Sequence, residues 1–352
     1  MKKIILSILL SVFFFSSLCF AAATDIQFYG YTWFRETGTV AQYSDTLNDT
    51  SKPSIERAYL RWKLKYEENL EGNITLDIPM KSANTANSDW TTLVKYAFVD
   101  VKDILPEKGF MRIGVQPIYF AMIDKWEYPM VYKPLEDQLG LLSSADLGVS
   151  IQGNLPGGWA DYQIAAFGGN GYAKPTETDN NTATNLSMTI YPVSGLSIRG
   201  SSYNSIVSSG DAYAKEGIQA GKWYNGVAVS YTAGPVLLMW EGIEGMKPNS
   251  VMSDSFKVSG NSKMVLWNMN DLWAVAVRED MYDPDVNNEI KANNTTDSVQ
   301  DRMIYGVNYK WMKDLLLQLN YSKLIYAGGN QDLASNARYT EYQTILQLKW
   351  SF

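Results

Sequence analysis

The C-terminal segment alternates between apolar and polar side chains, and no other feature limits the possible folds of this chain as strongly. Counting back from Phe352, one face of the segment is apolar and the other is polar, with Ile345 out of pattern. A strand with this two-residue period separates two different environments. The apolar face comprises Tyr342, Leu346, Leu348, Trp350 and Phe352, and the polar face comprises Gln343, Gln347, Lys349 and Ser351.

The N-terminus has the features of a secretory signal peptide, which we assign to residues 1–23. Lys2 and Lys3 precede an apolar run, 4–20, and three alanines then form a small-residue cleavage site. The run is too short to be a stable membrane anchor. The expected mature chain is residues 24–352. An exported chain that ends in an alternating strand with a terminal aromatic is typical of bacterial outer-membrane β-barrels.

The residue types that the mature chain lacks narrow its chemistry. The chain contains no histidine, and its single cysteine, Cys19, leaves with the signal peptide. Leu18 argues against a lipoprotein anchor there, because a small residue is expected before a lipidated cysteine. Most schemes for activating a nucleophile need His or Cys, so we expect no enzyme, no catalytic residue, no metal and no cofactor. Carboxylate pairs such as Glu67-Glu68 are interpreted as solvated turns.

Charge and hydropathy restrict the environment further. Two of the 30 basic residues leave with the signal peptide, so 28 basic residues face 37 acidic ones and the mature balance is −9. This balance argues against nucleic acid as a partner. No stretch after the signal has eighteen consecutive apolar residues. A chain of this kind can span a membrane only as a closed barrel, because lipid offers no hydrogen bonds to unpaired backbone groups.

Segments of about ten residues with alternating character recur along the mature chain. Their connections alternate between short turns and long loops, as expected for periplasmic turns on one rim and outer loops on the other. The pattern predicts an all-β fold, a single closed antiparallel transmembrane β-barrel of 16 strands, with both termini at the short-turn rim. A soluble β-sandwich gives no reason for sorting loops by length. The predicted strands are 26–36, 54–66, 70–80, 92–101, 110–118, 146–154, 159–169, 184–192, 195–203, 222–232, 235–245, 261–268, 272–281, 302–311, 315–326 and 340–352.

The two faces of the predicted strand 54–66 differ most clearly. One row is apolar and the other is basic, and a cation facing lipid at the bilayer midplane costs about 2–4 kcal/mol. The basic row must therefore face a water-filled lumen. The residues predicted to line the pore or contact solute, in this strand and others, are Arg57, Tyr59, Arg61, Lys63, Lys65, Arg112, Gln116 and Arg199.

The longest connection, 119–145, is predicted to fold into the barrel as a constriction loop. Its aromatic residues suit burial better than bulk water, and its charges would then lie in the pore. An outer lid or a latch between subunits is the alternative. The charged residues of the candidate constriction loop are Asp124, Lys125, Glu127, Lys133, Glu136 and Asp137.

A second loop, 282–300, carries with the end of the preceding strand a run of oxygen-bearing side chains that resembles the front half of a calcium loop. It lacks the glycine and the final glutamate of that motif. A solvated outer loop is the simpler interpretation, and a weak divalent-ion site stays open. The side chains in question are Asp280, Asp283, Asp285, Asn287 and Glu289.

Several short motifs, in their order along the chain, resemble the phosphate-selective porin O and P family. They include that family's Arg-rich second strand, its D-A-Y-V-D strand and the lead-in to its constriction loop. The resemblance implies a sixteen-stranded, trimeric porin whose third long loop narrows the channel. The matching stretches are 55–61, 95–100, 114–117, 146–149, 167–171, 231–235 and 306–309.

The resemblance leaves the solute open. Phosphate selectivity in that family depends on many pore cations, and the constriction loop here also carries acids, which departs from the pattern. The positions that match the family's pore cations are Arg57, Arg61, Lys63, Arg112 and Lys125.

Together these features predict an outer-membrane porin for passive diffusion of small hydrophilic solutes. Most acids fall in exposed connections, where salt screens them, whereas basic residues line the wall, so a mild anion preference is expected. The alternatives are a substrate-specific porin for phosphate or another anionic nutrient, and a plugged structural or adhesive barrel. Expected partners are outer-membrane lipid and lipopolysaccharide, two further copies in a homotrimer, and the barrel-assembly machinery, which would recognise Phe352.

Overall fold

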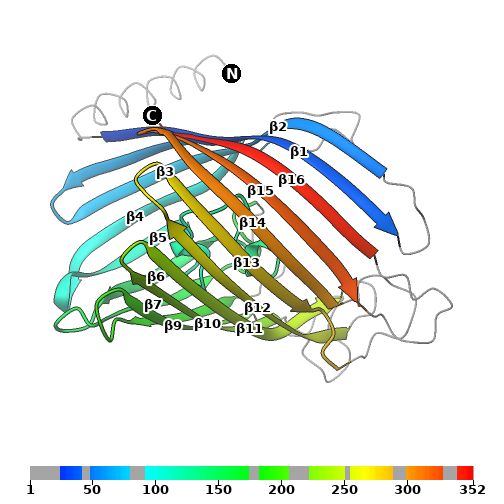
Figure 1. Cartoon of the computed structure of the whole chain (residues 1–352). Helices are drawn as coiled ribbons and strands as arrows, with labels where there is room; N and C mark the ends of the chain where they lie inside the picture. Colours follow the sequence, from blue (N-terminus) through cyan, green and yellow to red (C-terminus); the bar gives the residue numbers. More distant parts are fainter. Residues whose placement is uncertain are drawn as a thin grey trace, which may run out of the picture.

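A computed structural model describes residues 24–41, 48–79, 92–173, 182–205, 222–249, 254–287, 299–327 and 339–351. The described residues form a closed antiparallel barrel of sixteen strands, in which each strand pairs with its neighbours in sequence and the last pairs with the first (Figure 1). The strands are Thr24–Ala41 (β1), Asn48–Glu67 (β2), Leu70–Pro79 (β3), Leu93–Leu105 (β4), Gly109–Pro117 (β5), Ala145–Asn154 (β6), Ala160–Phe167 (β7), Ala183–Ile190 (β8), Leu196–Ser205 (β9), Lys222–Ala233 (β10), Val236–Asn249 (β11), Asp254–Asn268 (β12), Trp273–Asp283 (β13), Val299–Met312 (β14), Leu315–Ala327 (β15) and Tyr339–Ser351 (β16).

Each of the sixteen predicted segments is a strand, and the predicted fold class is confirmed. The main differences lie at the long-loop rim, where several strands are longer than predicted. β2 begins at Asn48 and β12 at Asp254, because the hairpins go on pairing beyond the apolar alternation: Thr39 lies opposite Asn48, and Asn249 opposite Asp254. Polar residues can continue the hydrogen-bonded strand pairing above the membrane, because no face of the strand contacts lipid there and an apolar residue at every second position is no longer needed.

The short turns are tight hairpins, as predicted. Between β10 and β11, Ala233 lies opposite Val236 across a two-residue turn in which Gly234 has a φ of +55°. β1 and β16 pair along their length to close the barrel, and at this rim Tyr29 of β1 lies opposite Ser351 of β16. Both ends of the described barrel therefore lie at the short-turn rim.

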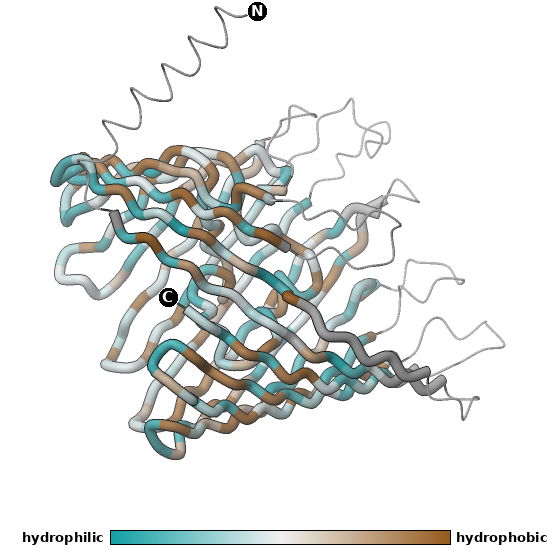
Figure 2. The backbone as a smooth tube through the Cα atoms, turned by 90° about the horizontal axis from the view of Figure 1, so that it is seen from above, coloured by the Kyte–Doolittle hydropathy of each residue, from teal (hydrophilic) through white to brown (hydrophobic). Residues whose placement is uncertain are grey.

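The outward faces of the strands are apolar and exposed. On β1, Ile26, Phe28 and Phe34 have exposed fractions of 58%, 42% and 49%, whereas Tyr31 on the opposite face is 5% exposed. Figure 2 shows this alternation of hydrophobic and hydrophilic residues along the strands. An exposed apolar outer surface on a closed barrel is the surface of a transmembrane barrel. No helix among the described residues is long and apolar enough to cross a membrane, a finding that concerns helices alone.

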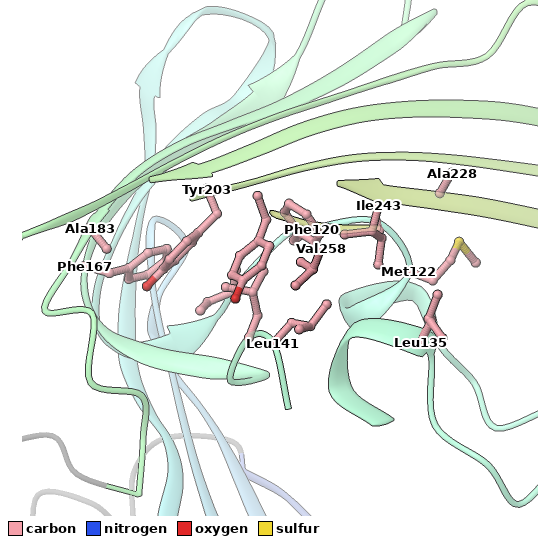
Figure 3. Packing of buried hydrophobic residues seen from close by; sticks show 14 of the residues in the cluster. Phe120, Met122, Leu135, Leu141, Phe167, Ala183, Tyr203, Ala228, Ile243 and Val258 are labelled. Atoms are coloured by element: carbon pink, nitrogen blue, oxygen red, sulfur yellow. The ribbon is translucent and has the colours of Figure 1, made fainter. Parts of the chain in front are cut away.

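The third long connection, 118–144, folds into the barrel and packs against inward-facing wall residues to form its hydrophobic core. It contains two short helices, Ile123–Lys125 (η2) and Leu135–Gln138 (α2). A third short helix, Pro106–Lys108 (η1), lies in the β4–β5 turn. Figure 3 shows loop residues such as Phe120 and Leu141 against wall residues such as Phe167 and Tyr203. The predicted in-folded third loop is confirmed.

The loop also packs against the wall from β12 to β16. There Met130, Val131 and Tyr132 contact Ile304 and Ile345, and all five side chains are buried. This packing explains why Ile345 breaks the alternation of the last strand. A lumen-facing side chain is apolar where the loop, and not water, covers it.

Candidate functional site: the channel lumen

The loop 118–144 is fastened to the wall by buried ion pairs and hydrogen bonds. Arg199 of β9 is 3% exposed and forms a two-pronged ion pair with the carboxylate of Asp124, with an Nη2–Oδ2 distance of 3.1 Å. Arg199 also donates to the Ala121 carbonyl at 3.2 Å and to Thr189 Oγ1 at 3.0 Å. This arginine, predicted to line the pore, is therefore an anchor of the loop.

A second anchor joins helix α2 to β11. Glu136 is fully buried and Glu241 is 3% exposed. Glu136 Oε1 accepts a hydrogen bond from the Met122 amide at 3.0 Å, and Glu241 Oε1 accepts one from the Leu135 amide at 2.9 Å. The two carboxyl groups lie close enough to interact electrostatically. Burial, followed by the charge of Glu241, raises the pKa of Glu136 well above its usual value.

The far part of the loop is held by polar side chains of β13 to β16. Arg278 donates to the Lys133 carbonyl at 2.6 Å, and Asn308 donates to the Pro129 carbonyl at 2.7 Å. Tyr132 Oη donates to Gln343 Oε1 at 2.8 Å. These bonds satisfy backbone groups that an irregular segment would otherwise leave unpaired inside the barrel.

Two cavities flank the loop. One, of about 830 Å³, lies between the loop and the wall from β8 to β15. The other, of about 800 Å³, lies between the loop and the wall formed by β16 and β1 to β5. Loop residues Asp124, Trp126, Glu127 and Tyr128 line both. The loop thus divides the lumen at this level without filling it.

The basic face of β2 points into the lumen, as its alternation predicts. Arg61 donates to Tyr29 Oη at 2.7 Å and to Thr75 Oγ1 at 3.2 Å, and it lines the cavity of about 800 Å³. Arg57 donates to Tyr59 Oη at 2.9 Å and lies 3.6 Å from a carboxylate oxygen of Asp77.

Lys63 and Lys65 lie nearer the short-turn rim and are exposed. Lys63 forms an ion pair with Asp25 at 3.3 Å, and its side chain is 50% exposed. Two charges that exposed interact weakly, because water and salt screen them. Of the basic row of β2, Arg57 and Arg61 are the members placed deep in the lumen.

Two further predicted residues are held by their neighbours. Arg112 forms a bidentate pair with Asp100, at 2.6 and 2.8 Å, so its charge is neutralised. Gln116 is fully buried, donates to the Gly148 carbonyl at 3.0 Å and accepts from Ser150. Its side chain joins β5 to β6 and lines neither of the two large cavities, so it does not face solute in this structure.

The loop lysines have acidic partners. Lys125 lies 3.5 Å from Asp161, and Lys133 lies 3.4 Å from Asp137. Burial lowers the pKa of both lysines, and the nearby charge of Arg57 lowers that of Lys133 further. Asp124, Lys125, Glu127 and Asp137 of the predicted loop residues border the cavities, whereas Glu136 is an anchor. Arg199 of the wall also borders the cavity of about 830 Å³.

Two lumen cations, Lys95 of β4 and Lys349 of β16, were not among the predicted pore residues. The ammonium of Lys95 lies 4.8 Å from the centre of the Tyr59 ring, and that of Lys349 lies 6.0 Å from the ring centres of Tyr31 and Tyr128. Both lysines line the cavity of about 800 Å³. The polar face of the last strand was a signal for Lys349, whereas Lys95 stands in a strand whose alternation is irregular.

In the described part of the possible divalent-ion loop, acidic side chains bind other groups of the protein. Asp280 binds Arg278 at 2.6 Å, and Asp283 Oδ1 accepts a hydrogen bond from the Asp285 amide at 3.0 Å. Glu289 lies outside the described residues. The described part of the chain contains no cluster of three potential metal-ligating side chains from His, Cys, Asp and Glu.

Comparisons with known proteins find likeness in structure and not in sequence. No protein-family model and no curated protein matches the chain. An anion-selective porin from Comamonas acidovorans has a TM-score of 0.64 at 11% identity, over 94% of this chain and 100% of that one. The outer-membrane channel DcaP of Acinetobacter baumannii has a TM-score of 0.64 at 13% identity, over 94% and 98% of the two chains. A trimer form of the outer-membrane protein OmpT of Vibrio cholerae has a TM-score of 0.57 at 14% identity, over 93% and 100%. This chain thus has the fold of outer-membrane porins.

Proposed function

We propose that this chain is an outer-membrane porin through which small hydrophilic solutes diffuse passively, with a mild preference for anions. The main support for this proposal is the shape of the lumen. The third loop narrows the lumen but does not fill it, and cavities of about 830 and 800 Å³ lie on the two sides of the loop. The fold, shared with channels such as the anion-selective porin of Comamonas acidovorans, supports the same assignment. Transport then needs no catalytic residue, because the solute gradient supplies the driving force.

The anion preference rests on the positions of the charges. Arg61, Lys95 and Lys349 line one cavity, and none forms an ion pair with a carboxylate of the described residues. Their polar partners are phenol oxygens, Thr75 and the Glu127 carbonyl. Several acids of the same cavity, by contrast, are paired: Asp25 with Lys63, Asp124 with Arg199, and Asp137 with Lys133. A low-dielectric wall focuses the field of unneutralised charges into the lumen.

Recording in planar lipid bilayers tests the channel function. Purified protein should give stepwise, stable increases in conductance in KCl, in proportion to salt concentration. A barrel plugged for a structural or adhesive role would give none. Conductance that reaches a plateau as phosphate concentration rises would favour the narrower alternative, a phosphate-selective porin, to which the motifs of β2, β4 and β5 point.

We further propose that the protein functions in the bacterial outer membrane as a homotrimer. Residues 1–23 would direct export, and residues 24–352 would form the barrel among lipid and lipopolysaccharide. The apolar outer surface supports membrane insertion, and the trimer form of the similarly folded OmpT supports this assembly. Chemical crosslinking in native membranes would test the trimer, with a ladder ending at three copies as the expected result.

A further inference from the structure

We propose that the cavity of about 800 Å³ between the loop and the wall formed by β16 and β1 to β5 is a binding site for an aromatic carboxylate. The inference rests on the proposed channel function and adds to it a class of preferred solute. The site combines ring faces with cations that have no carboxylate partner. Its volume falls within the range of small-molecule pockets.

The rings form two pairs along the wall and the loop. Tyr29 of β1 stacks on Tyr59 of β2 with ring centres 4.9 Å apart, and Tyr31 meets Tyr128 of the loop at 5.0 Å. All four rings line the cavity, Tyr31 and Tyr59 as largely buried side chains and Tyr29 and Tyr128 as partly exposed ones. A flat, apolar ring of a solute would find aromatic neighbours here in place of water.

Cations alternate with these rings. Arg61 lies 5.1 Å from the centre of the Tyr29 ring, and Lys95 lies 4.8 Å from that of Tyr59. Lys349 lies 6.0 Å from the ring centres of Tyr31 and Tyr128. Contact with a ring face stabilises a cation less than a carboxylate does, so an entering carboxylate would gain charge-assisted hydrogen bonds.

Lys95 is the most informative of the three cations. It is 8% exposed, and its hydrogen-bond acceptor is Tyr59 Oη, at 3.2 Å. A buried ammonium normally has a charged partner, because burial without one is costly. The position of Lys95 between rings, and not in a ring of converging donors, favours an anion that carries its own aromatic body over bare phosphate.

Blockade of single-channel current distinguishes these solutes. We would add sodium benzoate, cyclohexanecarboxylate, acetate or inorganic phosphate to the protein in planar bilayers and measure the concentration that halves the current. Benzoate should act at a concentration about tenfold lower than acetate and lower than cyclohexanecarboxylate, since each added recognition element contributes to affinity. Equal effects of benzoate and acetate, or stronger blockade by phosphate, would overturn the assignment.

Two substitutions locate the site. Lys95→Gln and Tyr29→Leu should each raise the half-blocking concentration of benzoate by about tenfold. The half-blocking concentration of acetate should change less with Tyr29→Leu than with Lys95→Gln, because acetate has no ring to contact Tyr29. Lys310→Gln, in the other cavity, is the control and should leave benzoate blockade unchanged. If Tyr29→Leu does not fold, Arg61→Gln replaces it with the same expectation as Lys95→Gln. A conducting protein whose variants all match the wild type contradicts the site alone, whereas a protein without conductance contradicts the channel as well.

Discussion

At the residue scale, the face of the strand decides whether a charge is tolerated. On β2, Leu60 lies between Phe28 and Leu76 on the outward, lipid-facing row. Its neighbour Arg61 points inward and is hydrogen-bonded to Tyr29 and Thr75. Adjacent residues of one strand therefore meet lipid and water, and substitutions that exchange their polarity should have opposite consequences.

Leu60→Arg should destabilise the barrel by about 2–4 kcal/mol if the site lies near the midplane, because a cation then faces hydrocarbon. Arg61→Leu should leave folding nearly unchanged but alter conductance. Urea titration of folding into lipid vesicles measures the first effect, and bilayer recording measures the second. Destabilisation by Arg61→Leu with none by Leu60→Arg would mean that the two faces of β2 are reversed.

At the element scale, the loop 118–144 behaves as a separate piece held inside the barrel by a few buried polar contacts. The pair of Arg199 with Asp124 holds its first half, Glu136 with Glu241 its helix α2, and Arg278 its second half. The sequence predicted that the loop enters the barrel, because its aromatics suit burial. It could not show which wall residues hold the loop, since these come from strands far away in the chain.

The apolar residues of the inner face were equally hard to predict from the sequence. Leu237, Leu238 and Met239 are three consecutive apolar residues, so alternation does not assign them to the two faces of β11. In the structure Leu238 faces outward at 43% exposure, whereas Met239 packs against the loop cluster. Alternation identifies the two faces of a strand, but it does not reveal that part of the inner face is covered by protein.

Arg199→Gln should loosen the loop. The substitution leaves the Asp124 carboxylate buried without its partner, a change that typically costs about 3–5 kcal/mol. We expect larger conductance fluctuations and easier proteolysis within the loop. The double variant Arg199→Gln with Asp124→Asn, which removes both charges, should restore much of the loss. Equal behaviour of the single and double variants would show that this ion pair does not hold the loop.

The Glu136–Glu241 contact should make the loop sensitive to rising pH. Because the pKa of Glu136 is raised in the folded protein, by burial first and by Glu241 second, its contribution to anchoring is complete below the ordinary carboxyl pKa. It is lost as pH rises through the raised pKa. The other charged groups that face the pair are Arg278 and Asp280 of β13, and the single arginine cannot neutralise three carboxylates.

Single-channel current noise in the wild type should therefore increase as the pH rises through the raised pKa of Glu136. Glu136→Gln keeps a neutral, hydrogen-bonding side chain and should abolish this increase. Asp137→Asn, one residue along the same helix but paired with Lys133, is the matched control and should retain it. A pH response that is unchanged in Glu136→Gln would place its origin elsewhere.

At the scale of the whole molecule, the fold followed from alternation, loop lengths and the closing strand. The pore chemistry was harder to predict, because it depends on which charges neutralise one another. Arg112 and Arg199 look like free cations in the sequence but are paired with Asp100 and Asp124. Lys95 and Lys349 attract little notice, yet they lack a carboxylate partner among the described residues.

Assembly of the barrel should depend on Phe352, which lies outside the described residues. Its removal should lower the amount of folded barrel in outer-membrane fractions while leaving export unaffected, because the signal peptide acts earlier than strand recognition. Heat-modifiable mobility in gels measures folding, and Ser351→Ala is the control. Normal insertion of the shortened chain would contradict a role for Phe352 in assembly.

The reversal potential in a KCl gradient measures the ion preference of the pore. We expect a mild anion preference at moderate salt that moves toward cations when Arg61, Lys95 and Lys349 are together replaced by Gln. The effect should shrink at high salt, where the field of these charges is screened. Either of two results would contradict the proposed role of these cations: a wild-type pore that already selects strongly for cations, or a triple variant that leaves the reversal potential unchanged.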